Sequence, residues 1–206
     1  MKRLFLSISL ILSVAMVAMA DSPLTSTVFW KVLNSAGEAD RHPVLRTFDE
    51  YGWGDEVMAV LCSPSVPVEQ RLCLVNYIGW DFDGQKHYAD LVSYYVRKNG
   101  IESKQKVYDG MYGEQMIVFA YVKAMDNYFD VARAERIGRE AVKRSPKSRA
   151  VNVIAALIKA QQLLDSDWAG VYKVCNNVVT DKSLNRDFSD EAVQAIMEYI
   201  GLYSEY

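Results

Sequence analysis

Apolar residues recur at the spacing of an α-helix over most of this chain, and this pattern restricts the possible folds more than any other feature. Residues 84–98 are the clearest case, with an apolar stripe on one face and charged or polar residues on the other. The stripe consists of Tyr88, Leu91, Val92, Tyr95 and Val96. Glycine and proline interrupt the pattern at short intervals. We therefore predict an all-α protein of about nine short helices in successive antiparallel pairs, without strands.

Residue types that favour helix ends mark several of the predicted boundaries. Pro43 suits the first turn of a short helix, because an N–H group at that position has no partner within the helix. Asn99-Gly100 supplies a left-handed C-terminal cap. Residues 101–113 are less regular, which predicts a loop or a short helix. The predicted N-terminal caps are Ser26, Asp83 and Ser145, the last followed by Pro146 as the first helical residue.

Residues 116–122 are apolar on every side of a helix. Neighbours must cover such a helix on most sides, so we expect residues 114–122 near the centre of the molecule. Short apolar runs also occur as buried strands, and a strand in this protein would lie here. The helical patterns on both sides favour a helix.

Two successive segments repeat one order of elements, namely a helix that is apolar almost all round, a turn and an amphipathic helix. They span residues 114–146 and 147–182. Ala134, Ala141 and Pro146 stand where tetratricopeptide repeats have small residues at the helix crossing and a closing proline. This part of the chain resembles a degenerate tetratricopeptide-type repeat. The resemblance implies helical hairpins stacked as a short superhelix.

Other positions depart from that repeat pattern. Val122 and Met125 replace the glycine and tyrosine that are usual in the first helix, and Lys182 stands where the second segment would have its proline. Close helix packing favours small residues in many helical proteins. An irregular bundle of helical hairpins is therefore the alternative architecture.

Residues 1–20 have the composition of an export signal. Lys2 and Arg3 form a positive start, an apolar stretch follows, and Ala18-Met19-Ala20 supplies the small residues that signal peptidases accept. We expect cleavage at that point, which leaves residues 21–206 as one helical domain of an exported protein, periplasmic in a Gram-negative cell. A membrane anchor is the alternative. Because the apolar run is short for a span, we expect no stable membrane span after cleavage.

The charge and the cysteines narrow the choice of partners and cofactors. The formal net charge is −3, whereas a dedicated nucleic-acid-binding protein needs a basic surface, so we expect no nucleic-acid partner.

Cys62 and Cys73 lie on adjacent predicted helices, and a disulfide could join them. The slightly favoured alternative is that all three cysteines, including Cys175, are buried as free thiols. The sequence has no Cys-x-x-Cys motif or Cys/His cluster, which argues against a zinc site.

One segment partly matches a calcium-binding loop. If Gly84 takes the sixth position, Asp81, Asp83 and Asp90 fall on three of the ligand positions. Gly79 at the first position has no side-chain oxygen, and Asp90 is shorter than the usual glutamate. A turn that caps a helix explains the aspartates more simply, so we expect no metal and no cofactor.

The sequence contains no motif of a common catalytic centre. Its two histidines, His42 and His87, lie in a predicted turn and beside an apolar stripe. Glu50, Asp55 and Glu114 are the carboxylates that an enzyme acting on envelope polymers would use in pairs. Acidic residues at a helix start also stabilise the helix dipole, which is the interpretation we favour for residues 55–56. Such a hydrolase is the alternative function.

Tyrosine is in excess, with 13 residues, and its flat ring with a polar tip suits contacts with proteins, peptides or glycans. Tyr94 must point about 100° away from its helical neighbour. It could rim a groove together with Tyr108 and Tyr112, while Trp53 lies in an exposed turn between two glycines. The predicted ligand-binding residues are Trp53, Tyr94, Tyr108 and Tyr112.

These observations together predict a binding protein. We expect an exported, non-enzymatic binding or scaffolding module for a protein, peptide or glycan in the cell envelope. Self-association through an exposed apolar helix face is a further possibility, and the sequence does not predict the oligomeric state.

Overall fold

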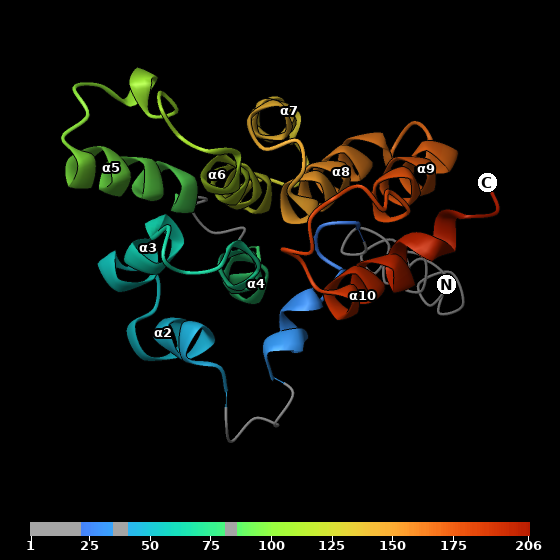
Figure 1. Ribbon diagram of the computed structural model, residues 1–206, viewed down its shortest axis with the longest axis horizontal. Coiled ribbons are helices and arrows are strands. Elements are labelled where there is room, and N and C mark those ends of the chain that lie inside the picture. The colour runs from blue at the N-terminus through green and yellow to red at the C-terminus, as the bar shows by residue number, and fades with distance from the viewer. Residues whose placement is uncertain (1–21, 35–40, 81–85) are drawn as a thin grey trace, which may run out of the picture.

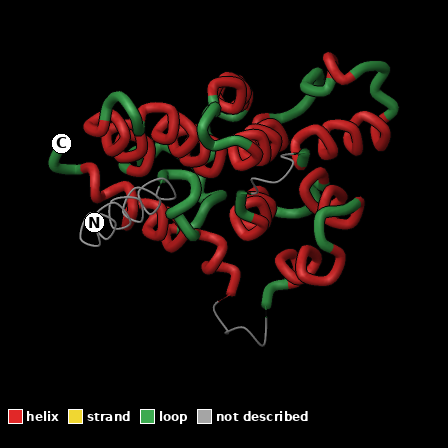
Figure 2. Tube along the Cα trace, turned by 180° about the vertical axis from the view of Figure 1, so that it is seen from behind, coloured by secondary structure: helices red, strands yellow, loops and turns green. Residues whose placement is uncertain are grey.

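A computed structural model describes residues 22–34, 41–80 and 86–206 of the chain. The predicted signal segment and the aspartates Asp81 and Asp83, with the predicted cap at Asp83, lie outside these residues. Within them the secondary structure consists of helices, turns and loops, and no strand occurs (Figures 1 and 2). The all-α prediction is confirmed. Residues 114–122 are helical, so the alternative of a buried strand is wrong.

The helices follow one another with short connections. Their bounds, in chain order, are η1 Phe29–Asn34, α2 Pro43–Tyr51, α3 Asp55–Cys62, α4 Val68–Ile78, α5 His87–Asn99, η3 Lys104–Lys106, α6 Gly113–Asp126, α7 Ala132–Arg144, α8 Arg149–Leu163, α9 Trp168–Val179, α10 Asp190–Ile200 and η4 Gly201–Tyr203. The elements labelled η are short 3-10 helices. The irregular segment 101–113 contains one of them, as predicted.

The helices lie in two tiers, and α6 is at the centre of the upper one. Figure 1 shows α5, α6, α8 and α9 in the upper tier, with α7 above them, and α3, α4 and α10 in the lower tier, with α2 beneath. Helix α6 contacts α4, α5, α7 and α8. Its apolar run is buried throughout, and Phe119 and Tyr121 have no exposed surface. The central position predicted for residues 114–122 is confirmed.

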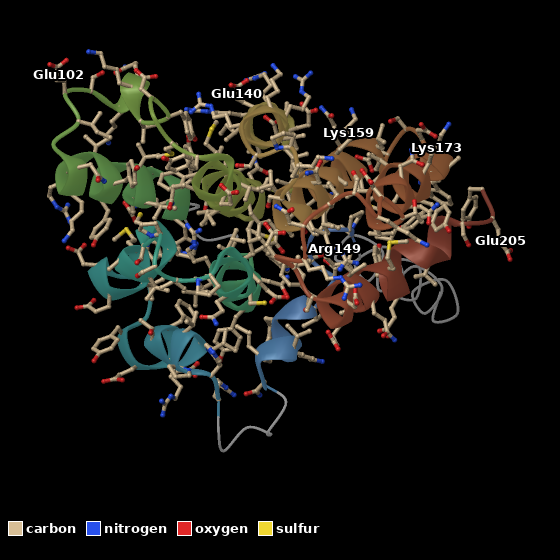
Figure 3. The ribbon with its side chains drawn as sticks, in the orientation of Figure 1. Glu102, Glu140, Arg149, Lys159, Lys173 and Glu205 are labelled. Atoms are coloured by element: carbon tan, nitrogen blue, oxygen red, sulfur yellow. The ribbon has the colours of Figure 1, made fainter. Side chains whose placement is uncertain are left out.

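The two predicted hairpin segments lie next to each other. Helix α6 packs against α7, α8 packs against α9, and α7 joins the two pairs by packing against both α6 and α8. Gly138 of α7 lies at this contact, where a Cβ atom would be in ordinary van der Waals contact with Ala155 and Ile117. Long charged side chains point away from the bundle, as Figure 3 shows for Glu140 and Lys159.

Some predicted helix ends are confirmed. Pro43 is the first residue of α2, and the Nδ1 atom of His42 accepts the N–H of Val44 at 3.3 Å, so this histidine is the N-cap. Gly100 ends α5 with φ 62°, a left-handed conformation that only glycine adopts cheaply.

Two predicted caps are wrong. Ser145 ends α7, and α8 begins only at Arg149, where the hydroxyl of Ser148 accepts the N–H of Val151 at 3.1 Å. The Ser145 hydroxyl is used between helices instead, because it accepts the N–H of Gly113. The Ser26 hydroxyl accepts the N–H of Ser22 in a preceding turn, and a 3-10 helix starts only at Phe29.

The segment before the first helix is held by buried polar side chains. Asn76 of α4 donates to the carbonyl of Thr27 at 3.0 Å and to the Tyr121 hydroxyl at 2.9 Å, and it accepts the N–H of Trp30 at 3.0 Å. Gln161 of α8 accepts the N–H of Leu24. These bonds join residues 24–30 to α4 and α8, and Asn76 also joins α4 to α6.

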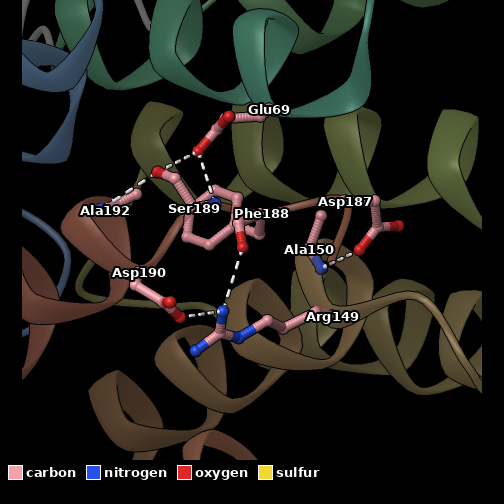
Figure 4. A network of polar contacts seen from close by, with 8 residues as sticks. All are labelled: Glu69, Arg149, Ala150, Asp187, Phe188, Ser189, Asp190 and Ala192. Carbon is pink, nitrogen blue, oxygen red and sulfur yellow. Dashed lines mark hydrogen bonds and ion pairs between the residues drawn. The ribbon is translucent and has the colours of Figure 1, made fainter. Parts of the chain in front are cut away.

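The loop between α9 and α10 is held in a similar way (Figure 4). Glu69 at the start of α4 accepts both the N–H and the hydroxyl of Ser189, and that hydroxyl in turn caps α10 by accepting the N–H of Ala192. Arg149 of α8 pairs with Asp190 and also donates to the carbonyl of Phe188. The loop therefore links the N-termini of α4, α8 and α10.

No helix in the described part of the chain is both long and apolar enough to cross a membrane.

Candidate functional site

The predicted tyrosine groove is not assembled. Tyr94 is only 8% exposed, and Arg97 lies over its ring. Tyr108 packs its ring against Phe119 and shares a hydrogen bond of 2.7 Å with the hydroxyl of Tyr88. Tyr112 is 79% exposed and lines a pocket that neither of the other two tyrosines reaches. The reason is that Tyr94 and Tyr108 pack into the core, where aromatic rings bury the most area.

Trp53 belongs to another cluster, at the start of α5. Its ring centre lies 4.3 Å from that of His87, and its Nε1 donates to Asp90 at 3.3 Å. The Nδ1 atom of His87 lies 3.7 Å from a carboxylate oxygen of Asp126. The indole therefore contacts Asp90, which falls on one of the ligand positions of the partial calcium-loop match. Within residues 22–34, 41–80 and 86–206, no group of three or more His, Cys, Asp or Glu could hold a metal ion.

All three cysteines carry free thiols. The possible Cys62–Cys73 disulfide is not formed, and Cys73 instead points its sulfur at the carbonyl oxygen of Phe29, 3.9 Å away. Burial raises the pKa of Cys62 and of Cys175 to about 12, and it raises that of Cys73 as well. The cysteines act as small apolar residues, as the alternative prediction has it.

The three candidate catalytic carboxylates lie in different surroundings. Asp55 is exposed and accepts two hydrogen bonds from Arg97, at 2.9 and 3.2 Å. Glu50 is exposed near the end of α2. Glu114 lies at the start of α6 and accepts the hydroxyl proton of Ser145 at 2.8 Å. The pocket that Glu114 lines includes neither of the other two carboxylates.

A mostly apolar pocket lies at Glu114. It has a volume of about 320 Å³ and lies between the α3–α4 connection, the first turn of α6 and the loop before α10. Its apolar wall consists of Pro64, Val66, Pro67 and Val68. The remaining wall is formed by Arg71, Tyr112, Glu114, Gln115 and Asp187. A mostly apolar cavity with a few fixed polar groups is the usual form of a ligand site.

Arg71 is the unusual member of this wall. It is only 4% exposed, its Nη1 donates to the side-chain oxygen of Gln115 at 2.8 Å, and its buried Nε has no hydrogen-bond partner. None of the ion pairs between described residues includes Arg71. Burial lowers the pKa of the guanidinium, and the nearby Glu114 carboxylate partly offsets this effect. A buried cation without a directly bound carboxylate is costly.

Gln115 holds the guanidinium in place. Its Nε2 donates to the carbonyl of Leu61 at 3.1 Å, so its oxygen is turned toward Arg71. The arginine therefore presents a positioned set of donors, of which Gln115 satisfies one. Asp187, which also lines the pocket, is oriented too, because it accepts the N–H of Ala150 at 3.1 Å.

Sequence reasoning missed Arg71, although a signal was present. Val68 and Val75 lie three residues before and four residues after it, on the same face of a helix, and both are buried. A single arginine within such an apolar stripe indicates a buried cation. Its proximity to Gln115 and Glu114 depends on tertiary packing between α4 and α6.

Two other pockets are less complete as sites. The larger, of about 420 Å³, borders Ser22, the first residue that the structure describes, and is lined by Phe129 and Gln162 among others. The second, of about 370 Å³, lies over the loop before α10, where Arg149 is already paired with Asp190. Neither combines an apolar wall with a buried, unpaired charge.

No family model, no curated protein and no solved structure matches this chain.

Proposed function

We propose that this protein is an exported, non-enzymatic binding module that holds a peptide segment of an envelope protein in the pocket at Arg71. The observation that carries the proposal is the buried, positioned guanidinium at the wall of an otherwise apolar cavity. Export rests on the signal-like composition of residues 1–20.

The chemistry of the wall favours a peptide over a glycan. Prolines and valines offer apolar surface but no hydrogen bonds from their side chains, whereas sugars need many polar partners. Tyr112 adds a largely exposed aromatic ring, the residue type most enriched at protein contacts. A small pocket with one anchoring charge fits one or two residues of a peptide.

The test is selection from a synthetic library of random octapeptides, half with free and half with amidated C-termini. The mature protein is immobilised, and retained peptides are identified by mass spectrometry. Val66→Trp places an indole in the pocket, so it should abolish retention. Val28→Trp is the matched control, because Val28 is an exposed valine outside the pocket. It should retain the same peptides as the wild-type protein.

Selected peptides are then measured singly by calorimetry. One-to-one binding that Val66→Trp removes and Val28→Trp preserves supports the proposal. Failure to enrich any peptide, or enrichment that Val66→Trp leaves intact, would overturn it. Sedimentation of the unliganded protein tests self-association separately.

A further inference from the structure

We infer that the group recognised in this pocket is a single carboxylate carried on a small apolar body. This inference rests on the proposed function, because it concerns the same pocket, and it names the ligand chemistry that the proposal leaves open. The free acid could come from a small molecule or from a peptide.

The first argument is the unsatisfied hydrogen-bonding capacity of Arg71. A guanidinium has five donors, and those of Arg71 receive one acceptor, from Gln115. Its Nε is buried without a partner. A carboxylate accepts two parallel hydrogen bonds from a guanidinium, so it fits both the charge and the planar shape of this group. An amide or alcohol brings no negative charge to the guanidinium.

The second argument is the position of α6. Its N-cap residue Tyr112 and Glu114 of its first turn form part of the pocket wall, and the helix extends for 14 residues. The N-terminus of a helix favours a nearby negative charge. This effect is modest, but it has the same sign as that of the buried arginine.

The third argument concerns what the rest of the ligand must be. Two prolines and two valines form the apolar part of the wall, so the group that carries the carboxylate must be apolar. Glu114 and Asp187 line the same cavity and repel a second negative charge. The pocket should therefore prefer a monocarboxylate over a dicarboxylate.

The experiment compares isocaproate with isocaproamide, which share one apolar body and differ only in the terminal group, a charged carboxylate or a neutral amide. Calorimetry on the mature protein should show that the acid binds about ten- to a hundredfold more tightly than the amide, as expected for a charge-assisted bond. Succinate should bind more weakly than isocaproate. A hexapeptide ending in leucine, as the free acid and as the amide, shows whether a peptide can supply the group.

Variants of the pocket separate recognition from folding. Arg71→Met removes the charge but keeps an unbranched, flexible side chain, and it should remove the preference for acid over amide. Arg97→Met, on the exposed face of α5, should leave that preference unchanged. Glu114→Gln should tighten acid binding severalfold and leave amide binding unchanged, since it removes a repelling charge. This second variant keeps the acceptor for Ser145, so the inference does not depend on whether Arg71→Met folds.

Equal affinity of the wild-type protein for the acid and the amide would overturn the inference, yet it would leave peptide binding in the pocket standing. The inference would also be overturned if Arg71→Met, shown to be folded by its circular dichroism spectrum, still bound the acid more tightly than the amide. A different result would contradict the proposed function, namely that the octapeptide library yields no peptide whose retention depends on the pocket.

Discussion

Single buried polar side chains hold distant parts of this chain together, and Asn76 is the clearest of them. Its amide donates two hydrogen bonds and accepts one, so it joins the N-terminal segment to α4 and α6. The Tyr121 hydroxyl, one of its partners, is completely buried, which raises the pKa of that phenol. A buried polar group that loses its partner costs more than the bond itself contributes.

We expect Asn76→Ala to lower the free energy of unfolding by about 2–3 kcal/mol, because the Tyr121 hydroxyl and the N–H of Trp30 lose their partner. Urea denaturation followed by circular dichroism measures the change. Asn177→Ala, an exposed asparagine on α9, should stay within about 0.5 kcal/mol of the wild-type value. Similar losses in both variants would contradict this account of Asn76.

Asp126 is a second buried group, and it makes stability depend on pH. One of its oxygens accepts the N–H of Tyr88 at 2.9 Å, and the other has no hydrogen-bond partner. Burial raises the pKa of this carboxyl above its ordinary value of 3.8, although His87 and Lys123 face it and oppose the shift. The protonated form is therefore favoured more strongly in the folded than in the unfolded state.

It follows that Asp126 stabilises the fold below pH 3.8 and that this contribution is lost as the pH rises through the higher folded-state pKa. The stability of Asp126→Asn relative to the wild-type protein should increase as the pH is raised from about 3 to about 5. Urea midpoints at several pH values measure this trend. Any packing cost of the amide is the same at each pH, so a constant difference would refute the prediction.

At the scale of the elements, capping serines determine where helices begin. Ser145 precedes a proline and has the local features of an N-cap, yet α8 is capped by Ser148. By local sequence alone, either serine could be the N-cap of α8. The choice depends on Gly113 of α6, which binds the Ser145 hydroxyl and lies too close to α7 for any larger residue, since a Cβ there would be 2.4 Å from the Ala141 carbonyl oxygen.

We expect Ser148→Ala to lower the free energy of unfolding by about 1 kcal/mol, the usual effect of removing an N-cap. Thermal and urea unfolding measure it. Ser166→Ala changes an exposed turn serine and should have an effect within about 0.5 kcal/mol of zero. A Ser148→Ala variant as stable as the wild-type protein would show that this hydroxyl does not cap α8.

At the scale of the whole molecule, the buried side chains form one continuous core from Leu24 to Ile200. Helix α10 belongs to it through η1 and α9, and its start is bound to α4 by the bonds between Glu69 and Ser189 (Figure 4). These two residues are far apart in sequence. Their contact closes the C-terminal helix onto the first half of the chain.

Glu69→Ala should therefore weaken the attachment of α10 and lower the free energy of unfolding by about 1–3 kcal/mol, the range for hydrogen bonds to a charged group. Hydrogen exchange of the amides in 190–200 should become faster than in the wild-type protein, while exchange in α6 should change less. Glu198→Ala, on the exposed face of α10, is the control. Unchanged exchange in α10 would contradict this role of Glu69.

Local sequence was sufficient for the helical class, for the central position of α6 and for the helix ends at Pro43 and Gly100. These features depend on periodicity and on the backbone preferences of single residues, which act within a few positions. The pocket at Arg71 could not be predicted in this way, because its walls come from residues 64–71, 112–115 and 187. Their meeting depends on how α4 packs against α6 and on the bonds that hold the last loop, and such contacts leave no periodic trace in the sequence.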